Sequence, residues 1–289
     1  MKIESLYQTY KPLLFSIAYH MLGSVSDAED VVQECFLAVY QLDEDTIRDM
    51  KAYLSKMVTN RCINLLKSAR KKREVYVGEW LPEPLVQDVK HGPQDQVECE
   101  ETISYAVLIL LENFSPPERA VFVLREVFGY TYREIASILE RSEASCRKIY
   151  SRLKQRMQQL DPATDSIKIK HEGKRVKEFI NALVDGKIEK ILELLTEDVV
   201  FISDGGGKVK AAINPIVGRS RVLALLGGIA KRFVHIEAHL QMINGQVGIL
   251  FIRENEIVAV MCFDMDPKTE RFQKIYFVLN PDKLKHIHL

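Results

Sequence analysis

The stretch SPPERAVFVLREVFGYTYREIASILERSEASCRKIYSRLKQRMQ, residues 115–158, decides how the first half of this chain is interpreted. It contains two clear capping boxes. Ser115 precedes two prolines and Glu118, and Thr131 stands three residues before Glu134. Each pair predicts a helix whose first backbone N–H groups are capped by side chains. Apolar residues recur behind both starts at helical spacing, so the stretch predicts consecutive packed helices.

A third helix of this stretch is predicted to begin at the cap Ser142. Its inner face would carry Cys146, Leu153 and Met157, together with Ile149 or Tyr150. Its outer face would carry Ser145, Arg147, Lys148, Ser151, Arg152 and Lys154. A short helix, a tight turn and a basic second helix are typical of a helix-turn-helix, whose cations neutralise phosphates and reach base edges. The alternative is an ordinary helical hairpin with a solvated basic face.

Composition bounds the class of protein. The 289 residues carry 40 basic and 40 acidic side chains, so the net charge favours no partner, although the charges are clustered. The five cysteines form no CxxC pair, which predicts neither a zinc site nor a disulfide framework. No apolar run is long enough to span a bilayer, and no signal peptide is recognisable. We therefore expect a cytoplasmic protein with no membrane partner, no metal and no cofactor.

Residues 1–75 are predicted to be wholly helical. One helix is expected to open with the capping box Ser26-Asp27-Ala28-Glu29, and its first half is acidic. Acids at a helix start stabilise the helix dipole, and they can also dock a basic partner surface. The next helix, from about Met50, places polar and basic residues along its outer side: Asn60, Arg61, Asn64, Lys67, Arg70 and Lys71. This set suits nucleic acid, including unstacked bases, although a basic helix end can also simply complement its own dipole.

Three of these segments, in this order, resemble a bacterial RNA polymerase sigma factor of the extracytoplasmic-function (ECF) group. The segments are DAEDVVQECFLAVY, AYLSKMVTNRCINLLKSARKKR and ERAVFVLREVFGYTYREIASILERSEASCRKIYSRLKQ. The resemblance implies that the first binds core RNA polymerase, the second holds the melted minus-ten element and the third reads the minus-thirty-five element. The polymerase contacts would lie at the β′ clamp and the β flap. The implied polymerase-binding residues are Asp27, Glu29, Asp30, Gln33, Glu34 and Phe36.

The rest of the chain is predicted to contain two linkers and a different fold. Residues 76–98 form a linker with the unusual run WLPEP, residues 99–160 form the second helical domain, and residues 161–171 form a second linker. Residues 172–289 begin with two helices and continue with five strand-like runs. This order predicts an α+β cone with a curved antiparallel sheet. The predicted fold class is thus an all-α N-terminal part, with two helical domains, followed by the cone.

The cone resembles the SnoaL-like fold, which is related to nuclear transport factor two, and a subgroup of ECF sigma factors carries such an extension. The motifs that carry this resemblance are WLPEP, DGGGK and NPDKL. The residues implied in regulation are Trp80, Leu81, Pro82, Asp204, Gly205, Gly206, Gly207, Lys208, Asn280, Pro281, Asp282, Lys283 and Leu284. We expect the DGGGK loop and the NPDKL tail to dock near WLPEP and to set the spacing of the two DNA-binding domains.

Other functions are also compatible with the sequence. Asp204, Asp264 and Asp266 could act as general bases if they were buried in a cone that turns over a substrate. His235 and His239 share a predicted strand face with Glu237 and Gln241. These residues could bind a metal, or they could simply form a polar strand face. A one-component DNA-binding regulator, with a cone that senses a small molecule, is the main alternative. An inhibitor that binds polymerase without reading a promoter is a further one.

Overall fold

The computed structural model describes residues 3–40, 47, 49–73, 76–86, 103–160, 172–232 and 235–288. These residues belong to two compact units. Residues 3–73 and 110–160 make up the first unit, apart from their undescribed positions, and residues 76–86, 104–109 and 172–288 make up the second. The division cuts across the predicted boundaries, because part of the predicted linker 76–98 packs with the C-terminal part of the chain. Residues 87–98 and the linker 161–171 lie outside the described residues.

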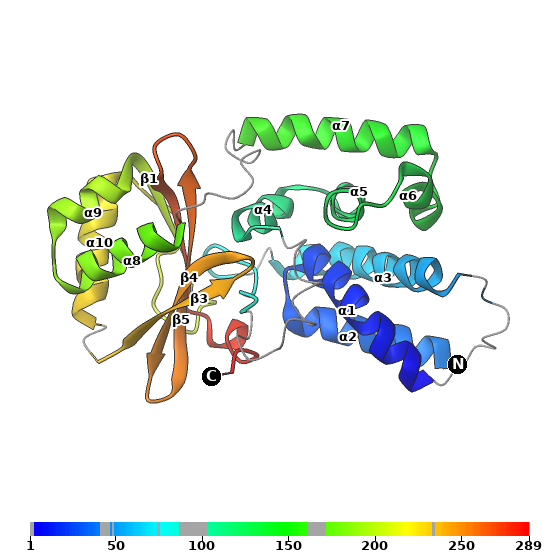
Figure 1. Ribbon diagram of the computed structural model, residues 1–289, viewed down its shortest axis with the longest axis horizontal. Coiled ribbons are helices and arrows are strands. Elements are labelled where there is room, and N and C mark those ends of the chain that lie inside the picture. Colours follow the sequence, from blue (N-terminus) through cyan, green and yellow to red (C-terminus); the bar gives the residue numbers. More distant parts are fainter. Residues whose placement is uncertain are drawn as a thin grey trace. The chain divides into compact units, whose positions relative to one another are not determined.

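The first unit begins with three helices, α1 (Ile3–Leu22), α2 (Val25–Tyr40) and α3 (Met50–Arg73), which pack on one another (Figure 1). Gly23 ends α1 with a φ of 66°, a conformation that favours glycine. The predicted capping box at Ser26 is wrong. The helix starts earlier, and the hydroxyl of Ser24 accepts a hydrogen bond from the backbone N–H of Asp27 at 3.1 Å.

The second helical group of this unit contains α5 (Pro116–Phe122), a π-helical turn (Val123–Val127), α6 (Tyr132–Leu139) and α7 (Glu143–Leu160). Both predicted capping boxes are present, at Ser115 with Glu118 and at Thr131 with Glu134. These hydrogen bonds hold the pKa of the Glu134 carboxyl below its usual value. The predicted cap of α7 is also confirmed, since the Ser142 hydroxyl accepts from the N–H of Ser145 at 3.2 Å.

Buried polar contacts join the two helical groups of the first unit. The Arg119 guanidinium, 2% exposed, donates to the carbonyl oxygen of Met21 at the end of α1 and to the Glu112 carboxylate. The hydroxyls of Ser55 in α3 and Tyr130 lie 2.8 Å apart in a buried position. Helix α3 accordingly contacts both α5 and α6. Because unpaired buried polar groups are costly, these bonds specify how the groups pack.

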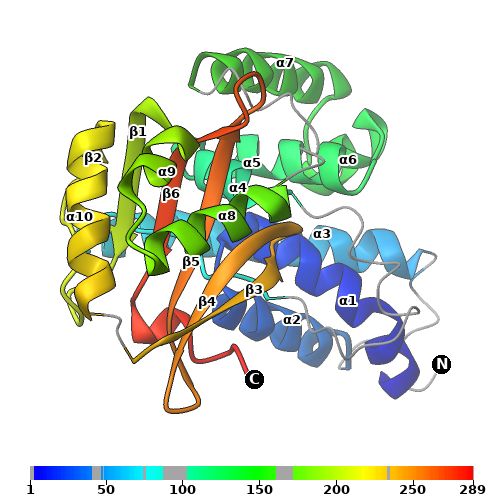
Figure 2. The same ribbon diagram turned by 60° about the vertical axis from the view of Figure 1, so that its left-hand side comes forward.

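The second unit is an α+β domain built on a six-stranded sheet. Its strands are β1 (Leu195–Asp204), β2 (Ile216–Val217), β3 (Glu237–Ile243), β4 (Gln246–Arg253), β5 (Glu256–Asp266) and β6 (Arg271–Val278), in the order β2-β1-β6-β5-β4-β3. The helices α8 (Glu172–Val184), α9 (Ile188–Leu194) and α10 (Arg219–Arg232) cover one face (Figures 1 and 2). The α+β class is confirmed. The fully antiparallel sheet is not, because β1 runs parallel to β6.

Side chains alternate between the two faces of this sheet. On the helix-covered face, Phe263 and Phe272 pack with Phe179 of α8, at ring centroid distances of 5.5 and 5.4 Å from that ring. On the other face, residues of β5 and β6 pack against Leu81 of the linker, Tyr105 of α4 (Tyr105–Leu110) and Leu284 of the tail. Linker, α4 and tail therefore complete the domain by covering the outer face of its sheet.

Candidate nucleic-acid surface and linker site

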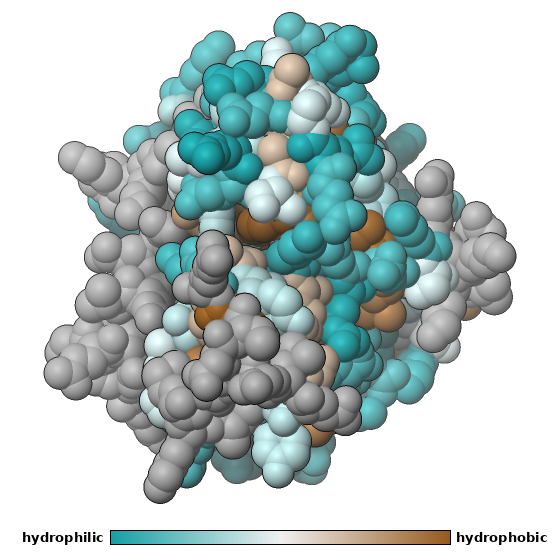
Figure 3. All heavy atoms as spheres, turned by 90° about the vertical axis from the view of Figure 1, so that its right-hand side faces the viewer, coloured by the Kyte–Doolittle hydropathy of each residue, from teal (hydrophilic) through white to brown (hydrophobic). Residues whose placement is uncertain are grey.

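The outer face of α7 is exposed, as the periodicity predicts. Arg147, Lys148, Ser151, Arg152 and Lys154 are exposed, Ser145 is half-buried at the capped start, and Cys146, Leu153 and Met157 are buried. Figure 3 shows the upper part of the first unit, where α6 and α7 lie in Figure 1, with mostly hydrophilic side chains. A row of cations on one helix face can neutralise successive phosphates of a duplex.

The rings of Tyr132 and Tyr150 lie against these cations, and neither tyrosine was predicted as a site residue. The guanidinium carbons of Arg125 and Arg147 lie 4.9 and 4.8 Å from the ring centroid of Tyr132. The Tyr150 ring meets Tyr132 edge-on, with centroids 6.0 Å apart, and its hydroxyl donates to the Glu126 carboxylate. Burial, and then this hydrogen bond, raise the pKa of the Tyr150 hydroxyl.

The outer side of α3 carries the residues predicted to hold unstacked DNA. Asn64 and Lys67 are exposed, whereas Asn60 and Arg61 are half-buried. Asn60, Asn64 and Lys67 line a cleft of about 390 Å³, together with Glu140 and other residues of the second helical group. The side chains of Arg70 and Lys71 lie outside the described residues.

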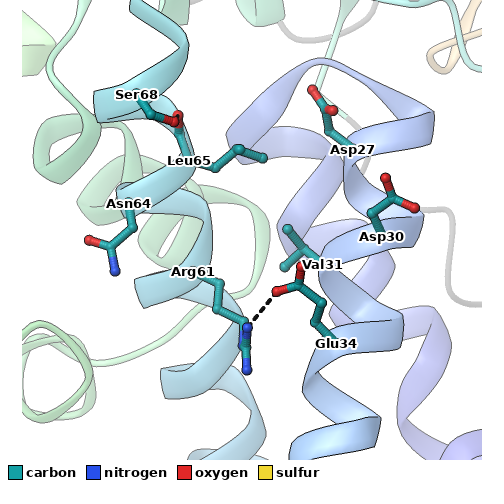
Figure 4. Close-up of a pocket in the computed structure, with 8 residues that line it drawn as sticks. All are labelled: Asp27, Asp30, Val31, Glu34, Arg61, Asn64, Leu65 and Ser68. Carbon is teal, nitrogen blue, oxygen red and sulfur yellow. Dashed lines mark hydrogen bonds and ion pairs between the residues drawn. The ribbon is translucent and has the colours of Figure 1, made fainter.

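A groove between α2 and α3 brings together residues predicted to bind different partners (Figure 4). Asp27, Asp30 and Glu34 of α2 line one side, while Arg61 and Asn64 line the other, around a space of about 430 Å³. The Arg61 guanidinium donates to the Glu34 carboxylate at 2.5 Å. A predicted DNA contact is thus paired with a predicted polymerase contact.

The remaining predicted polymerase contacts of α2 lie in two environments. Glu29 and Gln33 are exposed. Phe36 is 6% exposed and packs against Tyr7, with ring centroids 4.8 Å apart. Phe36 therefore stabilises the helical core in this structure and adds little to the exposed surface.

In the second unit, one buried carboxylate connects three segments that are far apart in the sequence. Asp204, at the end of β1, accepts hydrogen bonds from the Tyr76 hydroxyl at 2.6 Å, from the Leu81 N–H at 2.9 Å and from the Gly206 N–H at 3.0 Å. Lys283 of the tail is its ionic partner, with Nζ 2.6 Å from the carboxylate. Burial, and then the bond to Asp204, raise the pKa of Tyr76.

Lys283 holds the linker a second time. Its ammonium also donates to the Leu81 carbonyl, and it lies over the rings of Trp80 and Tyr76, 4.1 and 5.0 Å from their centroids. The next linker residue is held too, because the Tyr105 hydroxyl of α4 donates to the Pro82 carbonyl at 2.6 Å. The linker is therefore fixed both through its backbone and through its aromatic side chains.

Further contacts continue along the linker to Val86. Leu85 exchanges two hydrogen bonds with Asn244 of the β3–β4 turn, at 2.9 and 3.0 Å, and Val86 forms a bridge with Ile243. His286 of the tail lies 2.9 Å from the Pro84 carbonyl. Asn244 and Tyr76 were not predicted as site residues. An Asn-Gly pair, such as 244–245, is typical of a hairpin turn, but nothing local in the sequence indicates that Asn244 bonds to the linker.

The glycines of the DGGGK loop permit close approach to the tail and the linker. A side chain at Gly205 would meet the Val209 carbonyl at 2.2 Å, and one at Gly206 would meet the Asn280 amide at 2.2 Å. Gly206 also has a φ of 59°. Lys208 pairs with Asp282, and the hydrogen bonds from Lys208 and then Lys285 lower the pKa of Asp282 to about 2. The loop is thus docked on the NPDKL tail, and Pro281 begins the short helical turn Pro281–Lys283.

The candidate catalytic and metal-binding residues do not form a reactive centre in the part of the chain that the structure describes. The Asp204 carboxylate is occupied by its four partners, Asp264 pairs with Lys274, and Asp266 caps its own turn. His239 pairs with Glu237 on an exposed strand face. No group of three or more metal-ligating side chains occurs among the described residues.

None of the described helices has both the length and the apolar character that a membrane span requires.

Comparison with known proteins identifies the helical segments. Residues 6–72 match the family pattern of sigma-70 region 2, and residues 106–157 match that of sigma-70 region 4. The ECF RNA polymerase sigma factor SigJ of Mycobacterium tuberculosis (strain H37Rv) is 30% identical, over 84% of this chain and 78% of that protein. A probable ECF RNA polymerase sigma factor, SigI, from strain CDC 1551 of the same organism is 26% identical, over 98% and 94%.

A solved structure extends the likeness to the C-terminal domain. The crystal structure of the Mycobacterium tuberculosis sigma factor SigJ aligns with a TM-score of 0.78 at 26% identity, covering 97% of this chain and 98% of that one. The alignment therefore includes both the helical unit and the C-terminal α+β domain. A sigma factor directs transcription initiation and is not an enzyme. This chain belongs to the extracytoplasmic-function RNA polymerase sigma factors.

Proposed function

We propose a division of labour among the surfaces of this sigma factor, in which the C-terminal domain regulates the two promoter-binding parts through the linker. Helix α2 binds the β′ clamp of core polymerase, and the second helical group binds the β flap. Helix α3 captures the melted minus-ten strand, and α7 reads the minus-thirty-five duplex.

The helical assignments are supported by the charge of each surface. The acidic side of the α2–α3 groove, with Asp27, Asp30 and Glu34, complements a basic polymerase segment. The exposed cations of α7 complement duplex phosphates, and Asn64 and Lys67 offer donors to unstacked bases.

The regulatory assignment rests on one observation, the pair of Asp204 and Lys283 closed around Leu81. The linker joins the two promoter-binding domains, so its path limits how far apart they can lie. While the pair holds residues 76–86 on the sheet, those residues cannot extend. The domain acts as a scaffold in this proposal, because its inner face is filled by packed phenylalanines.

In vitro run-off transcription tests the proposal. Core RNA polymerase is combined with the full chain and a genomic promoter pool, and transcripts that require this chain are expected. The triple variant R147A/K148A/R152A should lose transcripts that depend on the upstream element. The exposed Lys190→Ala substitution in α9 is the matched control and should leave them unchanged. Duplex binding without any added transcript would instead favour a one-component regulator.

A further inference from the structure

Tyr132 of α6 and Tyr150 of α7 form an aromatic pair among the cations of the helix-turn-helix. We propose that Tyr132 is a positioning residue that holds the Arg147 guanidinium ready to read a base edge, and so contributes to promoter specificity. This inference rests on the proposed reading of the upstream duplex by α7. It concerns how the Arg147 side chain is oriented, and therefore how well α7 distinguishes the promoter sequence from other DNA.

The three elements that build this site meet at the Tyr132 ring. Tyr132 is the first residue of α6, Arg147 lies in the first half of α7, and Arg125 comes from the π-helical turn that ends α5. Both guanidinium carbons lie within 5 Å of the ring centroid, at 4.9 and 4.8 Å. Arginine over an aromatic face is an attractive cation–π geometry.

The Tyr132 ring is itself held in place by Tyr150. The Tyr150 ring stands edge-on to Tyr132, its hydroxyl donates to Glu126, and the Lys154 ammonium lies 5.8 Å from its centroid. Glu126 follows Arg125 in the same π-helical turn, so this turn supplies a partner to each ring. Such turns are frequent at functional sites, because the additional residue redirects side chains locally.

Preorganisation of arginine matters more for base reading than for phosphate contact. A bidentate arginine must present its planar fork in one orientation to a guanine, whereas a phosphate accepts a cation in many orientations. An exposed cation–π contact biases the arginine toward its stacked rotamer by about two- to fivefold. Loss of the ring should therefore lower the preference for the promoter over a scrambled sequence by that factor. The affinity for non-specific DNA should stay nearly unchanged.

The test uses holoenzyme made from core polymerase and the full chain. Its affinity is measured for a promoter that the run-off experiment identifies, and for the same promoter with the upstream segment scrambled. The ratio of the two affinities is the readout. Tyr132→Leu should lower this ratio about two- to fivefold, with an unchanged salt dependence, because Arg147 keeps its charge. Tyr132→Phe keeps the ring and should keep the ratio.

A double substitution separates positioning from general damage. Arg147→Lys keeps the charge but removes the fork, so it should lower the ratio on its own. If Tyr132 acts through Arg147, the double variant Y132L/R147K should be no less selective than R147K. Independent, multiplying effects would overturn the proposal, and so would a Tyr132→Leu variant with the wild-type ratio. If R147K itself kept the ratio, the reading role proposed for Arg147 would fail as well.

Discussion

The carboxylate of Asp204 lies 2.6 Å from the ammonium of Lys283, and their side chains are only 0% and 7% exposed. The Leu81 N–H donates to the first of these groups, and the Leu81 carbonyl accepts from the second. One linker residue is therefore held by both members of a buried ion pair. Neutralising either side chain leaves the other charge buried without its ionic partner and weakens the hold on Leu81.

Asp204→Asn should destabilise the C-terminal domain strongly. Removal of one partner from a buried ion pair costs about 3–5 kcal/mol, because the remaining charge is left without compensation. Trp80 is the single tryptophan of the chain and lies against Lys283, so its fluorescence reports on the linker directly. We expect urea unfolding, followed at Trp80, to shift to markedly lower denaturant.

Two controls belong to this experiment. Lys187→Met removes an exposed ion pair with Asp185 in the same domain and should change stability by less than about 1 kcal/mol. The double variant D204N/K283M should be more stable than the sum of its single effects predicts. Equal unfolding midpoints for D204N and K187M would exclude a structural role for the buried pair.

Gly206→Ala should open the contact between the DGGGK loop and the tail. The added carbon would lie 2.2 Å from the Asn280 amide, at a φ of 59° that L residues rarely adopt. Gly227→Ala in α10 meets no atom within 4 Å and should stabilise its helix by about 1 kcal/mol. Opposite shifts in thermal midpoint are thus expected from the same chemical change, and a shared direction would contradict the docking of the loop.

The first unit should lose stability in mild acid through His20. Burial lowers the pKa of this imidazole from 6.5 to about 4, so the unfolded chain takes up a proton more readily than the folded one. The contribution of neutral His20 is complete above pH 6.5 and is lost as the pH falls toward 4. Between pH 7 and pH 5 we expect a loss of about 2 kcal/mol, which the variant His20→Gln should lack. Parallel pH profiles in urea unfolding, followed by circular dichroism, would contradict this assignment.

Glu34→Gln should strengthen the binding of single-stranded promoter DNA to the free chain. The Glu34 carboxylate engages Arg61, a proposed DNA contact, and both side chains are partly exposed. An exposed ion pair is worth roughly 0.2–1 kcal/mol, so its removal should raise affinity by at most about fivefold. Fluorescence anisotropy with a labelled oligonucleotide measures this effect. If Arg61→Ala leaves the affinity unchanged, the DNA role of Arg61 is wrong, whatever Glu34 does.

Local signals made much of the helical unit predictable. The capping boxes at Ser115 and Thr131, and the cap at Ser142, depend on residues only three positions apart, and the structure confirms all three. The start of α2 was misplaced because serines at both 24 and 26 fit an N-cap pattern. In the structure Ser24 is the cap, since its hydroxyl accepts a hydrogen bond from the Asp27 N–H.

Long-range partners were not predictable from one sequence. The parallel pairing of β1 with β6 joins segments separated by about 70 residues. The periodicity of a single sequence does not indicate which strands pair. Helix α10 was missed, since Gly227 and Gly228 interrupt its pattern. The motifs WLPEP, DGGGK and NPDKL indicated the linker site, but Tyr76 and Asn244 enter it only through the fold.

The most direct test of regulation by the linker site is the promoter output of full-length Asp204→Asn. Run-off transcription would compare wild type, D204N and the control K187M at equal concentrations of core polymerase, with Trp80 fluorescence recorded on the same samples. We predict that D204N changes transcript yield severalfold and K187M does not. If D204N released the linker, as seen at Trp80, and still gave the wild-type yield, the C-terminal domain would not regulate through this contact.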